Sequence, residues 1–374
     1  MIELSSKEYY NKVFGSWLGR VAGDFVGIPV EAWRYEAILK KYGDITYFPE
    51  TINLDHVNDD EMYEIVALIA MEKYGINLTA QQLSQEWLNL LSRKDNIFTA
   101  EKIAYNNLEA GVLPPKSGIL NNFYYDFIGA QMRADIWGQI APGCPEIAKE
   151  YAELDGSISH AGLGIEGEVF LAVLISQAFF ESDIRKNINN ALNYVPPESE
   201  SLFSETVLKA IGIYEENKTD FRAARKILIE EFWIKKMVPK VIGSSLVFKR
   251  DFVRSLVLNS GMGKIHTLPN IGIIILSLLY GAQDTEDPFG RSVCIAAMMG
   301  YDTDCNCGNI GALLGVQLGA EKIPAKWKNP LQDTFSTFVK AHEKWRISEL
   351  AQRITNIGIQ IVKEKSKNRI KIVK

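Results

Sequence analysis

The sequence has few cysteines and no long apolar run. Its four cysteines, Cys144, Cys294, Cys305 and Cys307, do not have the spacing of a disulfide framework, and the first residues do not read as a secretory leader. Both features favour a chain that stays in a reducing cytoplasm. The longest mostly apolar run, near Ile271–Leu279, is far shorter than the roughly 20 residues that a membrane helix needs. We therefore expect a cytoplasmic protein without a membrane span.

The chain also lacks an excess of basic residues and any regular alternation of strands with helices. The 41 Lys and Arg residues face 46 Asp and Glu residues, giving a net charge of −5. This balance argues against a broad nucleic-acid surface, while a local basic patch for phosphate stays open. No internal repeat or linker-like stretch divides the 374 residues, a length that fits one large domain or two ordinary ones.

Apolar residues at helical spacing predict a series of helices. The predicted helices span Lys7–Ala22, Ile65–Tyr74, Ala80–Leu91, Ala100–Glu109, Ile165–Phe180, Ser199–Glu216, Phe221–Trp233, Pro269–Gly281, Pro288–Met299 and Ile347–Glu364. The segment Leu246–Val257 fits a strand or a helix equally well. Ile165–Phe180 is apolar on most faces and is expected to be a central helix.

Glycines recur along one helix face at each end of the chain. The two sets are Gly15, Gly19, Gly23 and Gly27, and Gly308, Gly311, Gly315 and Gly319. Each interior glycine costs about 1 kcal/mol relative to alanine in a helix. Several on one face therefore need a reason, and the close approach of another backbone is the usual one. We expect these two helices to contact each other and to close residues 1–374 into one all-α domain, a single compact, orthogonally packed helical bundle.

Two predicted helix starts concentrate carboxylates. The first is Asn58-Asp59-Asp60-Glu61 and the second is Asp302-Thr303-Asp304. Helix capping is a sufficient explanation for the first segment alone, because Asn58 can cap the helix and Glu61 can complete a capping box. Acidic groups also suit the dipole of a helix N-terminus, and the second segment allows the same interpretation.

Capping leaves the repetition unexplained, because each acidic helix start follows or carries a glycine-lined face. Four carboxylates that converge repel one another unless a cation lies between them. Oxygen ligands of this kind suit Mg²⁺ or Mn²⁺ rather than zinc. The joint occurrence therefore predicts a metal site that contains Asp59, Asp60, Asp302 and Asp304.

Five segments in order resemble the ADP-ribosylglycohydrolases along nearly the whole chain. Gly23–Glu31 is similar to the family's N-terminal G-D-x-x-G-x-P-x-E, and Asn58–Glu61 falls where the family has T-D-D-T. Gly129–Arg133 resembles its G-N-G-x-M-R loop, and Ser159-His160 resembles its central S/T-H segment. Asp302–Cys305 falls on D-T-D-T/S, which is the most specific of these matches.

The resemblance implies an all-α hydrolase that holds two Mg²⁺ or Mn²⁺ ions and cleaves a glycosidic bond at the anomeric carbon of a ribose. The implied substrate is an ADP-ribosyl group on a protein or a small molecule. Simpler nucleoside-like N-ribosides and non-catalytic ADP-ribose binding are the alternatives. The implied metal ligands are Asn58, Asp59, Asp60, Asp302, Asp304 and Cys305, and the implied catalytic carboxylates are Glu31 and Asp60. The implied substrate-binding residues are Gly129, Gln131, Met132, Arg133, His160, Gly162 and Gly164.

Some of these residues also have ordinary structural interpretations. His160 fits a buried, hydrogen-bonded histidine at the entrance to a central helix as well as a substrate contact. Arg133 fits a surface charge, a packing residue or a phosphate contact. Gly162 and Gly164 precede a helix, where backbone N–H groups can face a diphosphate.

Three positions depart from the family pattern. Asn58 replaces a threonine, Gln131 replaces part of the asparagine-glycine pair, and Cys305 replaces a hydroxyl with a soft sulfur that is a poor partner for Mg²⁺. These departures fit a subgroup with another ribosyl substrate, and they also fit lost activity. The presence of Glu31 together with all four aspartates favours an enzyme.

Overall fold

The computed structural model of this protein describes residues 2–92, 97–243 and 261–374. The segment Leu246–Val257, for which the sequence fits a strand or a helix, lies outside the described residues.

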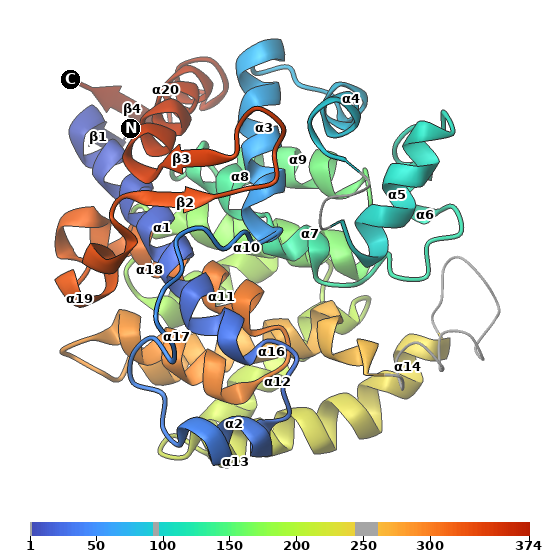
Figure 1. The fold of residues 1–374 in the computed structure, drawn as a ribbon, viewed down its shortest axis with the longest axis vertical. Coiled ribbons are helices and arrows are strands. Elements are labelled where there is room, and N and C mark those ends of the chain that lie inside the picture. Colours follow the sequence, from blue (N-terminus) through green and yellow to red (C-terminus); the bar gives the residue numbers. More distant parts are fainter. Residues whose placement is uncertain (1, 93–96, 244–260) are drawn as a thin grey trace.

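Helices make up most of the fold (Figure 1). The first half contains α1 (Ser6–Gly27), η1 (Ile28–Val30), α2 (Tyr35–Tyr42), α3 (Asp60–Tyr74), α4 (Ala80–Leu90), α5 (Thr99–Glu109), α6 (Lys116–Ile119), α7 (Gly129–Met132), α8 (Asp135–Gln139), α9 (Pro145–Gly156) and α10 (Leu163–Ala178). The second half contains α11 (Ile184–Ala191), η2 (Leu192–Tyr194), α12 (Leu202–Glu216), α13 (Phe221–Lys226), η3 (Ile227–Met237), α14 (Val238–Gly243), η4 (Met262–Ile265), α16 (Thr267–Gly281), α17 (Pro288–Met299), α18 (Thr303–Lys322), α19 (Ala325–Lys328), η5 (Asn329–Leu331) and α20 (Ile347–Lys365). The all-α prediction is confirmed.

Four short strands form two small sheets within the described residues. β1 (Ile2–Ser5) pairs in parallel with β4 (Ile370–Val373), and β2 (Thr334–Ser336) pairs antiparallel with β3 (Lys344–Arg346). The first pair places the two ends of the chain side by side (Figure 1).

Most predicted helices are present, and several of their ends agree with the prediction. α17 spans Pro288–Met299 as expected, and α3 ends before Gly75, which has a φ of 76° and donates its N–H to the Met71 carbonyl. α1 extends to Gly27, five residues beyond the predicted end. The predicted helix Phe221–Trp233 is divided, because α13 passes at Ile227 into a π-helical segment, η3.

The contact between α1 and α18 is the centre of the fold, and it confirms the prediction from the glycines. The two helices run antiparallel, so that Gly15 faces Gly315 and Gly19 faces Gly311. A Cβ atom added to Gly19 or Gly311 would overlap the backbone carbonyl of the other residue. Only glycine permits this backbone distance, and the two helices are therefore fixed along their length.

The composition of this contact differs from the prediction toward the start of α18. Gly23 meets the backbone of Cys307, and Gly27 meets the backbone of Thr303. Gly308 faces the side chain of Asp24, and Gly319 has a non-helical φ of 70° near the end of α18. The nearest backbone contacts on α18 therefore fall at Thr303, Cys307, Gly311 and Gly315. Backbone atoms of Gly308 and Gly319 also lie 2.9 and 2.7 Å from the positions that Cβ atoms at Gly23 and Gly15 would take.

Two apolar helices lie in the interior beside this pair. Every residue of α16 is buried, and most residues of α10 are buried, as expected for a central helix. Within the described ranges, no helix has the length and apolar character needed to cross a membrane.

Candidate active site

A cavity of about 400 Å³ opens where the starts of α3 and α18 meet. Its lining contains both polar and apolar side chains. The polar lining residues are Glu31, His56, Asn58, Asp59, Asp60, Thr99, Glu101, Asp302, Asp304 and Cys305. The apolar lining residues are Val57, Phe98, Phe127, Ile128, Met132, Met262 and Ile265, and Gly129 also lines the cavity. The cavity therefore combines several acidic groups with a comparable number of apolar side chains.

The glycine contact explains why distant acidic segments converge here. At its end, Thr303 Oγ1 donates a hydrogen bond to the Gly27 carbonyl at 2.8 Å. Five residues beyond Gly27, the N–H of Ala32 donates to the Tyr301 carbonyl at 2.9 Å. These bonds tie the loop that carries Glu31 to the start of α18.

The helix-capping interpretation of the acidic segments is wrong. Asp59 is the N-cap residue of α3, and Asp302 is the N-cap residue of α18, yet neither side chain makes a capping hydrogen bond. Asn58 Oδ1 accepts the N–H of Asp59 at 2.9 Å instead of capping the first turn of α3. The side chains of these two N-cap residues thus do not cap the helices.

The donor set at the start of α18 fits a divalent cation. One ligand atom from each of Asp302, Asp304 and Cys305 lies within 4.8 Å of the others, and all three residues are buried. Asp304 Oδ1 has no hydrogen-bond partner among the described residues, and Asp60 Oδ2 lies 3.1 Å from Arg20 Nη2. Buried carboxylate oxygens without partners are costly, and a cation bound between them removes that cost.

The carboxylates also oppose one another electrostatically. Burial raises the pKa values of Asp59, Asp60, Asp302 and Asp304, and the negative charge of Asp304 raises the first three further. In the absence of a cation, this cluster therefore favours bound protons. A divalent cation favours the ionised form of each carboxylate instead.

Glu31 differs from these aspartates because it is the exposed acid of the cavity lining. The charge of Asp304 and then partial burial raise the pKa of Glu31 to about 7. A carboxyl group with a pKa near neutrality is suited to proton transfer at neutral pH.

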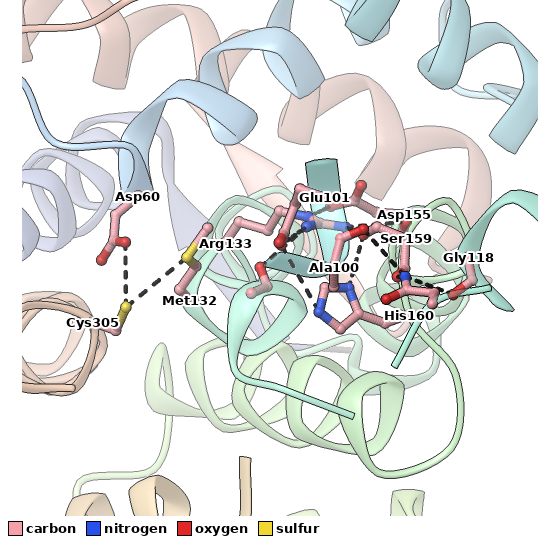
Figure 2. Close-up of polar contacts among 12 residues, drawn as sticks. Asp60, Ala100, Glu101, Gly118, Met132, Arg133, Asp155, Ser159, His160 and Cys305 are labelled. Carbon is pink, nitrogen blue, oxygen red and sulfur yellow. Dashed lines mark hydrogen bonds and ion pairs between the residues drawn. The ribbon is translucent and has the colours of Figure 1, made fainter. Parts of the chain in front are cut away.

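Cys305 lies between an acid and a second sulfur (Figure 2). Its Sγ donates to Asp60 Oδ1 at 3.3 Å and lies 3.9 Å from the sulfur of Met132. The thiol thus contacts both an acidic and an apolar residue of the cavity lining.

The family model of the ADP-ribosylglycohydrolases matches residues 5–362. The chain belongs to the ADP-ribosylglycohydrolase family. The resemblance drawn from the sequence motifs is thereby confirmed, and the family supports a glycohydrolase of ADP-ribose conjugates at its general level.

Two individual proteins extend this result. An uncharacterized protein from Archaeoglobus fulgidus is 24% identical over 354 residues, which cover 92% of this chain and 96% of that protein. A solved structure described as an ADP-ribosylglycohydrolase-related protein complex is 15% identical, with a TM-score of 0.58, and covers 94% of this chain and 99% of that chain. At this identity the solved structure shows that the fold is shared.

Arg133 of this ADP-ribosylglycohydrolase does not line the cavity, although the sequence predicts a substrate contact. The side chain is fully buried and donates to Asp155 Oδ2, Glu101 Oε1 and Ser159 Oγ at 2.9 to 3.0 Å (Figure 2). Its guanidinium carbon also lies 5.1 Å from the ring centroid of Tyr63 and 4.9 Å from that of Trp87. The packing interpretation of Arg133 is therefore the one that the geometry supports.

His160 belongs to the same buried cluster. Its Nδ1 lies 2.8 Å from Ser159 Oγ, and its Nε2 lies 3.9 Å from Glu101 Oε1. Burial, and then the positive charge of Arg133, lower the pKa of His160 well below the usual value. The histidine does not line the cavity, so the structural interpretation replaces the predicted substrate contact.

Three other predicted substrate-binding residues also lie away from the cavity wall. Gln131 is buried toward Gly167 of α10, while Gly162 and Gly164 form the turn into α10. Of the predicted substrate segment, Gly129 and Met132 line the cavity.

Sequence reasoning missed two functional residues of the site. Arg20 on α1 is fully buried and lies within 4 Å of four carboxylates, those of Asp24, Asp60, Glu64 and Asp135. An arginine between Gly19 and Gly23, on a helix that must contact another backbone, is the signal that could have identified it.

Glu101 is the second missed residue. It lines the cavity from α5, and Arg133 holds its Oε1 at 3.0 Å. A Cβ atom at Gly129 would overlap this carboxylate, which explains the glycine there. Burial, only partly offset by Arg133, raises the pKa of Glu101 to about 7. No motif distinguishes this glutamate in the sequence.

Proposed function

We propose that this protein hydrolyses the ribosyl glycosidic bond of an ADP-ribose conjugate, carried by a protein side chain or a small molecule, in a reaction that depends on divalent cations. The observation that carries the proposal is the convergence of Asp59, Asp60, Asp302 and Asp304 on one cavity that Glu31 also lines. The family membership of the chain supports the reaction class.

The acidic residues of the cavity lining would hold the cations. Asp59, Asp302 and Asp304 would act as ligands together with Asp60, Asn58 and Cys305, and the family resemblance favours two ions, Mg²⁺ or Mn²⁺. Bound there, divalent cations would hold the ribose hydroxyls and polarise a water molecule. The two oxygens of Asp60 already face Cys305 and Arg20, so we assign Asp60 to metal binding and orientation rather than to proton transfer.

Glu31 would act as the general base. It is the exposed acid of the cavity lining, and its raised pKa suits the acceptance of a proton from water. The water would attack the anomeric carbon as the bond to the leaving group breaks through an oxocarbenium-like state. The apolar lining residues, among them Phe127 and Met132, would keep further water away from that carbon.

A product screen tests this function. ADP-ribosyl-arginine, ADP-ribosyl-serine, O-acetyl-ADP-ribose and a panel of nucleosides are incubated with the protein in Mg²⁺, Mn²⁺ or EDTA, and products are separated by chromatography. We expect free ADP-ribose from at least one conjugate in a divalent cation and none in EDTA.

Nucleosides are included in the screen for a structural reason. Arg133, Gly162 and Gly164, the predicted phosphate contacts, do not line the cavity, and release of ribose from nucleosides alone would favour a simpler N-riboside hydrolase. The matched control is Glu31→Gln, which should abolish turnover while metal binding persists. Turnover that is unchanged in EDTA or in Glu31→Gln would contradict the proposal.

A further inference from the structure

The thiol of Cys305 lies within the group of atoms best placed to hold a cation. Its Sγ, one oxygen of Asp302 and one oxygen of Asp304 are all within 4.8 Å of one another. All three residues line the cavity, and Cys305 is only 4% exposed. The sulfur is therefore part of the donor set rather than a neighbour of it.

A second observation shows that this donor set is incomplete without a ligand. Asp304 is 5% exposed and lines the cavity, yet its Oδ1 has no hydrogen-bond partner among the described residues. Buried carboxylate oxygens are normally paired, and a cation is the partner that suits several of them at once.

The surroundings of the thiol do not suit hydrated Mg²⁺. The sulfur of Met132 lies 3.9 Å from Cys305 Sγ (Figure 2), and the apolar residues Ile128 and Ile265 also line the cavity. Mg²⁺ prefers oxygen ligands and usually keeps several water molecules, which need hydrogen-bond acceptors. A thioether sulfur is a poor hydrogen-bond acceptor for such water molecules, and hydrocarbon side chains accept no hydrogen bonds.

Thiolate and carboxylate together suit a softer cation. Thiolates bind Zn²⁺ and other late first-row ions well, and carboxylates are compatible with the same ions. Binding would exchange the S–H···Oδ1 hydrogen bond to Asp60 for a metal–sulfur bond, and the thiol proton would pass to solvent.

From this geometry we infer that Cys305 is a thiolate ligand that gives the cation position beside it a preference for Fe²⁺, Co²⁺ or Zn²⁺ over Mg²⁺. The inference rests on the proposed metal-dependent function and specifies the metal class of that same site. It predicts a metal selectivity that follows the residue at position 305.

Cys307 provides the matched control. It lies two residues further along α18 and is also fully buried, but its Sγ donates to the Val293 carbonyl at 3.2 Å. Cys307 does not line the cavity, and its backbone contacts Gly23 on the opposite side. Replacing this thiol therefore changes the cysteine count without changing the donor set.

The experiment uses Co²⁺ alone as the probe. The parent, Cys305→Ser and Cys307→Ser are titrated with Co²⁺, and absorption is followed in the near ultraviolet, where cobalt–thiolate charge transfer appears. We expect this band in the parent and in Cys307→Ser, and we expect Cys305→Ser to lack it while calorimetry still detects Co²⁺ binding.

Calorimetry with Mg²⁺ on the same proteins measures selectivity. The ratio of Co²⁺ affinity to Mg²⁺ affinity should fall by about tenfold or more in Cys305→Ser, since the loss of a metal-site partner commonly changes affinity by that amount. Circular dichroism melting of each variant in EDTA confirms that the serine proteins fold.

Two results would overturn the inference. One is Co²⁺ binding to the parent without a charge-transfer band, or a band that persists in Cys305→Ser. The other is an unchanged selectivity ratio in Cys305→Ser. If no protein binds any divalent cation, the metal-dependent function itself fails, and this inference fails with it. Binding of Co²⁺ without a band leaves the proposed function standing and removes only the role of Cys305.

Discussion

Two arginines are buried among carboxylates in this protein, and their surroundings differ. Each guanidinium nitrogen of Arg133 donates a hydrogen bond, to Glu101, Asp155, Ser159 or a backbone carbonyl. The rings of Tyr63 and Trp87 also pack against this guanidinium. The protein itself thus supplies a partner for every nitrogen of the Arg133 guanidinium. This arrangement is typical of a structural role.

Arg20 is surrounded by more acid than it can neutralise. Its Nη1 donates to Asp135 and to the Met132 carbonyl, whereas its Nε and Nη2 have no hydrogen-bond partner among the described residues. Carboxylate oxygens of Asp24 and Asp60 lie 3.6 and 3.1 Å from it, and those of Glu64 and Asp135 lie 3.8 and 2.8 Å from it. The difference indicates that the Arg20 region needs further positive charge, which is what a metal centre provides.

The largest expected effect comes from the glycine contact that positions the Arg20 region. Gly19→Leu and Gly311→Leu should each prevent folding or destabilise by at least about 3 kcal/mol, the upper end of ordinary overpacking, because the added atoms overlap backbone. Chemical denaturation of soluble protein measures the loss. Gly212→Leu is the control, since a Cβ atom there meets nothing within 4 Å. Normal stability of both Gly19→Leu and Gly311→Leu would show that the contact tolerates side chains.

The second prediction separates the two arginines directly. Arg133→Met should destabilise by about 3–5 kcal/mol, because it leaves Glu101 and Asp155 buried without their partner. The loss should be the same in EDTA and in a divalent cation. Arg20→Met should show a similar loss in EDTA but a smaller one with excess cation, which would take over the neutralisation. Urea midpoints measured in both buffers decide this, and equal rescue of both variants would remove the distinction.

A pair of aspartates sharpens the comparison at smaller cost. Asp155 accepts hydrogen bonds from Arg133 and from Trp137 Nε1, so Asp155→Asn should cost about 1–3 kcal/mol in either buffer. Asp302→Asn should cost nothing in EDTA, because it removes one of several mutually repelling acids. It should also lose the stabilisation that a cation gives the parent. Thermal melting in EDTA and in cation measures both effects, and a large loss for Asp302→Asn in EDTA would assign that residue a structural role.

These two regions also show what the sequence could and could not predict. The glycine spacing predicted the α1–α18 contact, and the paired acidic segments predicted which residues meet at the cavity. Both signals are local in the chain and act through backbone geometry. The substrate-binding motifs of the family predict Arg133, His160, Gly162 and Gly164 at the substrate, but from those motifs the cavity lining includes Gly129 and Met132 alone. Motif order does not show which side of α7 or α10 faces the cavity.

Residues without a local pattern were missed for the same physical reason. Glu101 looks like any acid in the first turn of a helix, and only the fold brings it to Gly129 and Arg133. The π-helical segment η3 likewise follows from packing rather than from a periodic signal that a sequence displays.

The smallest predicted effect is a pH dependence that belongs to the cavity. The folded protein holds the pKa of Glu31 at about 7, against an ordinary value of 4.5, so the folded state binds its proton more tightly than the unfolded state. In EDTA, stability should therefore fall as pH rises from about 4.5 to 7. A saturating cation should flatten this slope, because it favours the ionised carboxylate. Melting temperatures across this range test the point, with Glu31→Gln as the variant that lacks this contribution. A slope that is identical with and without cation would contradict it.

The most direct test of the proposed metal centre is the stability of the parent protein with and without divalent cations. Melting curves are recorded in EDTA and with an excess of Mg²⁺, Mn²⁺ or Co²⁺. A cation present at a hundred times its dissociation constant should stabilise the folded state by about 2.7 kcal/mol and raise the melting temperature accordingly. An identical melting curve in EDTA and in all three cations would contradict the assignment of the acidic cavity as a metal centre.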